Sequence, residues 1–148
     1  LYFTGASRSS AAIIDQQKKN TSSGNEKAIE AMHRIKRSAI DMKFALLKGD
    51  MQEFARILGE GWEDKKKMAD AITNPMIQNV FDTAMSAGAL AGKVSGAGGG
   101  GFVMLMVEPT RKKEVIDALN RLDGFVMPFQ FTEGGAHGWK IYSTDKVK

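Results

Sequence analysis

The segment with the clearest chemical potential is residues 96–101, where five of the six residues are glycine. Each glycine costs roughly 0.5–1 kcal/mol relative to alanine in regular structure, so a run of them needs a compensating role. A backbone without side chains can bring several N–H groups against one anion and form a concave phosphate site. A flexible linker is the alternative, but linkers are usually diluted with polar residues, whereas this run leads directly into the apolar Phe102–Val107. We therefore predict a phosphate-binding loop.

Three familiar phosphate-binding motifs match these letters in part, and each fails on its surroundings. A Walker loop needs Ser or Thr after its Lys to bind magnesium, but Val94 follows Lys93. The dinucleotide pattern is met by Gly96, Gly98 and Gly101, but a strand follows where a helix should begin. The same glycines match a protein-kinase loop, whose lysine strand, catalytic loop and metal-binding Asp motif are missing downstream. None of the three sites is assigned.

A longer stretch around the run resembles a known family motif. Residues 88–102 read Gly-Ala-Leu-Ala-Gly-Lys-Val-Ser-Gly-Ala-Gly-Gly-Gly-Gly-Phe. This resembles the third conserved motif of the GHMP kinases, which are named for galactose, homoserine, mevalonate and phosphomevalonate. Residues 1–5 with 7–9, and residues 62–66 leading to Asn74-Pro75, further resemble the branch acting on D-glycero-D-manno-heptose 7-phosphate. The resemblance covers essentially the whole chain, and galactokinase-like enzymes are the other leading substrate class.

The resemblance implies a two-lobed, ATP-dependent kinase with a ferredoxin-like C-terminal lobe. In this family the third motif lies near the nucleotide phosphates and the acceptor. Its counterparts here are Ser95, Gly96, Ala97, Gly98, Gly99 and Gly100. The usual Mg²⁺ ligand and, in many members, a catalytic Asp belong to an N-terminal ATP-binding lobe whose motif no stretch of this chain carries. We therefore assign no catalytic residue and no metal ligand, and we expect residues 1–148 alone to be inactive.

Phosphoryl transfer relies mainly on positioning and on neutralising the charge of the transferring group. Backbone N–H donors suit that task, and removing one well-placed donor costs on the order of 3 kcal/mol of barrier. We expect Gly98→Val to cut turnover in the complete enzyme with little change in lobe stability.

Basic residues offer further candidates for holding a substrate phosphate. Arg8 lies among serines at an expected helix start, where a phosphate would meet both its guanidinium and the helix N–H groups. The alternative interpretation is that Arg8 is a solvated surface residue. Lys93 either binds substrate or only flanks the loop. Lys65, Lys66 and Lys67 could face a sugar phosphate, but three consecutive residues cannot share one helix face, so a solvated surface is expected.

Hydrophobic periodicity predicts an α+β fold, a ferredoxin-like antiparallel sheet with additional helices. Residues 1–148 are taken as one domain of a longer polypeptide, because the chain opens on Leu1 without an initiator Met. The start also resembles a protease-cleavage scar, but Thr4 stands where Gln would follow, which favours a native strand. Predicted helices cover 11–17, 28–46, 51–72, 75–87 and 115–122, with a polar loop at 18–25. Predicted strands cover 1–3, Phe102–Val107, 125–131 and 139–142, with Pro128 indicating a sheet edge.

Composition narrows the remaining alternatives. A chain of 148 residues with 43% hydrophobic and 26% charged content is typical of one soluble domain. The absence of cysteine excludes zinc-thiolate and iron-sulfur sites and fits a reducing cytoplasm. The net charge of +4 is spread along the chain, so we expect no nucleic-acid partner, and no apolar run is long enough for a membrane span.

The expected partners are a small-molecule sugar or sugar phosphate and the protein's own N-terminal lobe, with homo-oligomerisation left open. A non-catalytic ferredoxin-like module that binds a phosphorylated metabolite is the alternative function.

Overall fold

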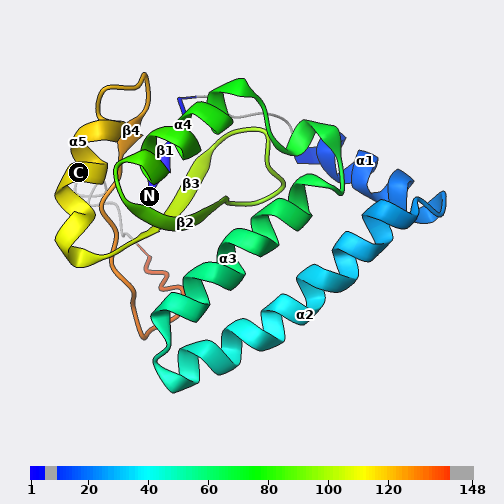
Figure 1. Cartoon of the computed structure of the whole chain (residues 1–148), viewed down its shortest axis with the longest axis horizontal. Helices are drawn as coiled ribbons and strands as arrows, with labels where there is room; N and C mark the ends of the chain where they lie inside the picture. Colours follow the sequence, from blue (N-terminus) through cyan, green and yellow to red (C-terminus); the bar gives the residue numbers. More distant parts are fainter. Residues whose placement is uncertain (6–9, 141–148) are drawn as a thin grey trace, which may run out of the picture.

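The computed structural model describes residues 1–5 and 10–140, in which helices pack on an antiparallel sheet (Figure 1). A short strand leads into helices α1 to α4, and two longer strands are followed by a last helix and a short strand. The elements are β1 (Tyr2–Phe3), α1 (Ser10–Ser22), α2 (Glu26–Lys48), α3 (Met51–Lys66), the 3-10 turn η1 (Asp70–Ile72), α4 (Pro75–Ser86), β2 (Ala89–Val94), β3 (Phe102–Val107), the 3-10 turn η2 (Pro109–Arg111), α5 (Lys112–Leu119) and β4 (Phe125–Val126).

The sheet has the strand order β2-β3-β1-β4, and each neighbouring pair is antiparallel. The first strand therefore lies between the third and the fourth, with helical connections from β1 to β2 and from β3 to β4. This is the arrangement of a ferredoxin-like fold, so the predicted fold class is confirmed. The strand that precedes Pro128 lies at the sheet edge, as predicted.

Helices α2 and α3 pair as a helical hairpin (Figure 1). Gly49 ends α2 in a left-handed conformation with φ of 70°, where glycine carries no Cβ penalty. Asp50 then caps α3, because its side chain accepts a hydrogen bond from the Glu53 N–H at 3.0 Å. The left-handed Gly49 and the Asp50 cap together form the turn of the hairpin.

The main core lies between the sheet and helices α4 and α5. Tyr2, Val94 and Val103 project into it from three strands and are completely buried. Trp62 of α3 joins this core and stacks on Phe81 of α4, with ring centroids 5.2 Å apart. Trp62 is therefore a core residue, 4% exposed.

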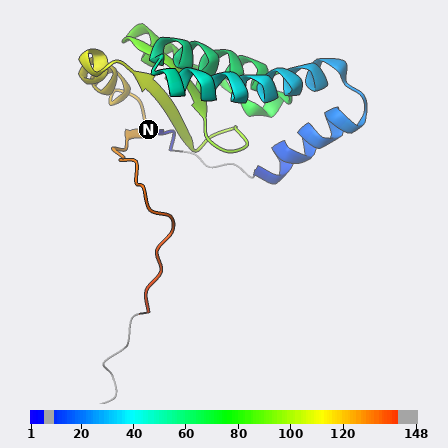
Figure 2. The same cartoon turned by 90° about the horizontal axis from the view of Figure 1, so that it is seen from below.

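The opposite sheet face is partly open. Because side chains alternate along a strand, Phe3, Phe102 and Phe125 lie there, and Phe3 has its ring centroid 5.1 and 5.3 Å from the other two. Beyond β4 the chain leads away from the sheet and helices (Figure 2), leaving Phe131 93% and Trp139 80% exposed. The protein therefore presents a cluster of aromatic side chains that its own helices do not cover.

One strand is absent from the sequence prediction, namely β2. Three of its six residues are Ala or Gly, and a Cβ at Gly92 would lie 2.7 Å from Leu105 Cδ2 and 2.8 Å from the Met104 oxygen. Close packing against β3, rather than β-propensity, therefore requires glycine at position 92. A pattern search for alternating large apolar residues cannot find it.

The largest errors in the predicted helix boundaries are the ends of α1 and α3. Helix α1 continues to Ser22 through the stretch predicted as a polar loop. The Asn20 side-chain amide donates to the Met68 oxygen at 2.8 Å, which holds the end of this polar helix against the segment after α3. The helix predicted over residues 51–72 ends at Lys66 and is followed by the η1 turn. None of the helices in the described ranges is long and apolar enough to cross a membrane.

The predicted C-terminal strands are also longer than those observed. The strand expected at 125–131 is ordered as a strand only over Phe125–Val126. Its partner β1 is equally short, and the last bond between them is Met127 N–H to the Leu1 oxygen at 2.9 Å. Trp139 belongs to no strand, and residues 141 and 142 of the last predicted strand lie outside the described residues.

Candidate phosphate-binding loop

The glycine run is the connection between the antiparallel strands β2 and β3. All five of its glycines have positive φ angles, from 71° at Gly96 to 155° at Gly100. Side chains with a Cβ rarely adopt these conformations, so this backbone path requires glycine. The glycine content that suggested a phosphate loop is therefore required, in the first place, by the backbone conformation of this connection.

The segment between η1 and α4 holds the middle of the loop. Gly99 donates its N–H to the Ile72 oxygen at 2.8 Å, and its own oxygen accepts from the Asn74 side-chain amide at 3.1 Å. Asn74 also caps α4 by accepting from the Ile77 N–H at 2.9 Å. A Cβ at Gly98 would come within 2.7 Å of the Ile72 oxygen, so the loop lies directly against this segment.

The two ends of the loop are held by the sheet. Ser95 donates its N–H to the Phe102 oxygen at 2.8 Å, and the Gly101 oxygen accepts from Thr4 N–H at 2.9 Å. The amides of Ser95 and Gly99 are therefore used inside the protein. Five loop amides donate no hydrogen bond within the described parts of the chain: Gly96, Ala97, Gly98, Gly100 and Gly101. Gly100 is buried, so the N–H groups of the other four residues are the ones free to meet an anion.

Lys65 reaches this loop from the end of α3, which differs from the solvated position expected for it. Its ammonium donates to the Gly96 oxygen and lies 3.5 Å from the Val94 oxygen. Burial and the nearby charge of Lys93 lower the pKa of Lys65 below its ordinary value. The loop therefore begins beside two positively charged side chains, one from α3 and one from β2.

Lys66 and Lys67 do not join this group. Lys66 pairs with Glu63 at 2.6 Å and Lys67 with Asp64 at 2.7 Å, so the three consecutive lysines point to different partners, as their spacing predicted. Arg8 lies outside the described residues.

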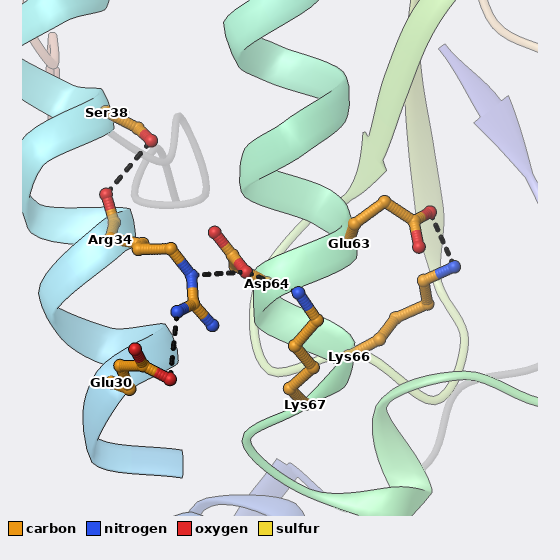
Figure 3. Close-up of polar contacts among 7 residues, drawn as sticks. All are labelled: Glu30, Arg34, Ser38, Glu63, Asp64, Lys66 and Lys67. Atoms are coloured by element: carbon orange, nitrogen blue, oxygen red, sulfur yellow. Dashed lines mark hydrogen bonds and ion pairs between the residues drawn. The ribbon is translucent and has the colours of Figure 1, made fainter. Parts of the chain in front are cut away.

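An open cleft of about 650 Å³ lies elsewhere, between α3, α4 and β2, and includes no residue of the glycine loop. Its basic side chains are paired with acids of the same cleft (Figure 3). The central group is Asp64, which accepts from Arg34 Nε at 2.9 Å and from Lys67 Nζ at 2.7 Å. Because these charges neutralise one another, the cleft is a poorer anion site than the loop.

Burial by itself would raise the pKa of Asp64, but its hydrogen bonds from Lys67 and Arg34 outweigh burial and hold that pKa below its ordinary value. The Arg34–Asp64 pair joins α2 to α3, so it is a structural link within the helical hairpin (Figure 3).

Sequence reasoning did not find the contribution of Lys65 and Asn74 to the loop. Both side chains bond to loop oxygens from positions at least 25 residues away in sequence. The side-chain oxygen of Asn74 caps α4, while its amide nitrogen bonds to the loop. Spacing along the chain carries no signal for such contacts.

Comparison with known proteins assigns the family. The model for the C-terminal domain of the GHMP kinases matches residues 42–123, more than half of the chain. This chain belongs to the GHMP kinase family. The matched GHMP domain includes Lys65, Asn74 and the entire glycine loop.

Individual relatives are sugar kinases. D-glycero-alpha-D-manno-heptose 7-phosphate kinase of Campylobacter jejuni is 43% identical over 141 residues, which is 95% of this chain and 41% of the relative. L-fucokinase/L-fucose-1-P guanylyltransferase of Bacteroides fragilis is 27% identical over 108 residues, 73% of this chain and 11% of the relative. The chain thus spans less than half the length of both relatives.

A solved structure shares the fold. Mevalonate kinase of L. major, crystallised with R-mevalonate, superposes with a TM-score of 0.73 at 20% identity, covering 81% of this chain and 36% of that one. This similarity supports the ferredoxin-like GHMP C-terminal fold.

Proposed function

We propose that this chain is the C-terminal lobe of an ATP-dependent kinase that phosphorylates a sugar or a sugar phosphate. The observation that carries the proposal is the glycine loop, whose free amides lie beside Lys65 and Lys93. Preorganised backbone donors and cations of this kind stabilise the charge of a transferring phosphoryl group. The named activity of the Campylobacter jejuni relative makes a heptose 7-phosphate the first acceptor to test. Galactose-like sugars, suggested by the resemblance of the glycine motif, are the second.

The loop fits a polyphosphate such as ATP, which would supply the phosphoryl group that is transferred. The amides of Gly96, Ala97 and Gly98 would bind phosphate oxygens, with Ser95, Gly99 and Gly100 shaping the backbone around them. Within residues 1–5 and 10–140, no three His, Asp or Glu side chains lie together in a way that could bind a metal ion. We therefore assign the ligands of Mg²⁺ to the N-terminal lobe, and no step of the reaction is derived through them.

The same proposal includes an N-terminal lobe as the physical partner and a cytoplasmic location. The open sheet face with Phe3, Phe102 and Phe125 is the surface we assign to this lobe, since exposed aromatic clusters mark packing surfaces. The relatives are longer than this chain, which supports a second lobe in the same polypeptide.

The test is a phosphoryl-transfer assay on the polypeptide that joins residues 1–148 to the ATP-binding lobe encoded in the same reading frame. We expect phosphorylation of a heptose 7-phosphate or of a galactose-like sugar with ATP, and no turnover by residues 1–148 alone. Calorimetric titration of residues 1–148 with ATP should give weak or undetectable binding, because most of the nucleotide pocket lies in the other lobe.

The alternative is a non-catalytic module that senses a phosphorylated metabolite. It predicts the reverse pattern, in which residues 1–148 bind a sugar phosphate tightly and the longer polypeptide transfers no phosphate. An unrelated domain or a stop codon immediately upstream would also favour the module over the kinase.

A further inference from the structure

Lys65 differs from the lysines next to it in what its ammonium contacts. Lys66 and Lys67 each pair with a carboxylate, whereas the contacts of Lys65 among the described residues are the backbone oxygens of Val94 and Gly96. It is half-buried and close to a second cation, Lys93. Its position on α3 therefore connects the helical hairpin directly to the first turn of the glycine loop.

The fold does not favour the charge of this side chain. Burial and Lys93 both lower the pKa of Lys65, which means that the charged form is less stable here than in water. No carboxylate in the described residues offsets that cost, in contrast to Asp64, which has two basic partners. An uncharged side chain of similar length at position 65 should therefore fold at least as well.

The contacts of Lys65 determine which way two loop peptides face. In a trans peptide the C=O and the N–H point in opposite directions. The peptide from Val94 to Ser95 shows this arrangement, with its oxygen toward Lys65 and its N–H bonded to the Phe102 oxygen. The Gly96 oxygen also points to Lys65, so the Ala97 N–H in the same peptide points away from α3. That N–H has no partner in the described residues and is free to meet a ligand.

We propose that Lys65 is a positioning residue that fixes the Gly96–Ala97 peptide so that the Ala97 N–H faces the phosphoryl group in transfer. This inference rests on the proposed kinase function of the loop. Lys65 acts through the backbone and needs no contact with substrate. Glycine at position 96 has φ of 71°, and without Lys65 this peptide can rotate at little steric cost, because nothing lies within 4 Å of the Gly96 Cβ position.

The experiment compares Lys65→Met, Lys65→Arg and the neighbouring control Lys66→Met in the complete two-lobed enzyme. Steady-state kinetics give kcat and KM, thermal unfolding gives stability, and hydrogen exchange followed by mass spectrometry reports on peptides that contain residues 95–101. For Lys65→Met we expect kcat to fall on the order of tenfold to a hundredfold, the size of effect caused by small misplacement of a catalytic group.

The remaining readouts separate positioning from a general structural role. With Lys65→Met the KM for the sugar and the melting temperature should stay near the wild-type values, while the hydrogen-bonded amides of Ser95 and Gly99 exchange faster. Lys65→Arg should recover most of kcat, and Lys66→Met should behave as wild type. The proposal is overturned if Lys65→Met keeps wild-type kcat, or if kcat falls only together with thermal stability while loop exchange is unchanged.

Failure of the proposed function gives a different result. If the wild-type polypeptide phosphorylates no acceptor, the kinase assignment is lost, and loop exchange alone decides the role of Lys65. Faster amide exchange in Lys65→Met then supports the proposal that Lys65 fixes the loop conformation, and unchanged exchange overturns that proposal.

Discussion

At the scale of single residues, the loop glycines differ in what prevents a side chain at each position. Gly96 has positive φ but open space around its Cβ position, whereas Gly98 has positive φ and a Cβ position 2.7 Å from the Ile72 oxygen. The structure therefore predicts that any substitution at Gly98 lowers stability, contrary to the expectation that Gly98→Val would leave the lobe unaffected.

Gly96→Ala should cost about 1–2 kcal/mol of unfolding free energy, from the left-handed backbone alone. Gly98→Ala should cost a further 1–3 kcal/mol, roughly the cost of overpacking, because backbone atoms of Ile72 must move. Urea unfolding of the two variants measures the difference. Gly61→Ala in α3 is the control, since its Cβ position is open and its φ is not positive, and it should stabilise by about 1 kcal/mol. Equal losses at positions 96 and 98 would contradict the assigned contact.

Thr73 lies between the two residues that hold the loop and has a buried hydroxyl without a hydrogen-bond partner in the described structure. An orphaned buried hydroxyl costs free energy, so Thr73→Val should raise the unfolding free energy by about 1 kcal/mol. Thr73→Ser, which keeps the hydroxyl and loses the methyl group, should not. Chemical denaturation distinguishes them, and a loss of stability in Thr73→Val would show that the hydroxyl has a partner.

At the scale of elements, the α2–α3 hairpin depends on Asp64, whose side chain is 9% exposed and accepts hydrogen bonds from Arg34 and Lys67. The folded pKa of Asp64 lies below its ordinary value of 3.8, so its stabilising contribution is complete above that pH and is lost as pH falls through the folded pKa. Asp64→Asn should lower the unfolding free energy by about 2 kcal/mol at neutral pH.

The difference between wild type and Asp64→Asn should shrink as both are unfolded at decreasing pH below 3.8, where the wild-type carboxyl becomes protonated. Glu63→Gln is a matched control on the same helix, because the Glu63 side chain is 61% exposed and its pair with Lys66 should contribute less than about 0.5 kcal/mol. A wild-type advantage over Asp64→Asn that is independent of pH would rule out the charged pair as its source.

At the scale of the whole molecule, the open sheet face should behave differently with and without the proposed N-terminal lobe. Phe125 is 49% exposed here, and its ring contacts Phe3 with centroids 5.3 Å apart. Phe125→Ser should cost residues 1–148 alone about 1 kcal/mol or less of unfolding free energy, because half of the side chain is already in water.

In the complete enzyme the same substitution should cost about 2 kcal/mol more, if the other lobe covers this face and buries the ring. Calorimetric unfolding of both proteins provides the comparison. Ile14→Ser serves as a control on α1, since that side chain is 40% exposed and lies on a helix away from the aromatic cluster. An equal effect of Phe125→Ser in the two proteins would remove this face from the lobe interface.

The sequence by itself determined the features that depend on local chemistry. Asn74 and Asp50 accept hydrogen bonds from the N–H groups three residues later, and Gly49 closes a helix in a conformation that other residues avoid. The apolar spacing marked the α2–α3 hairpin, and the GHMP motif marked the loop, because these signals lie within short stretches of chain.

The tertiary structure decided what depends on partners distant in the sequence. It placed Lys65 on the loop oxygens, used the amides of Ser95 and Gly99 internally, and left the Ala97 N–H free. It also formed β2, which has Ala and Gly at three of its six positions, and ended β4 where its short partner ends. Strand pairing and the hydrogen bonds of a half-buried ammonium group depend on residues that folding brings together. The direction in which each loop amide points is therefore fixed only when α3 packs along β2.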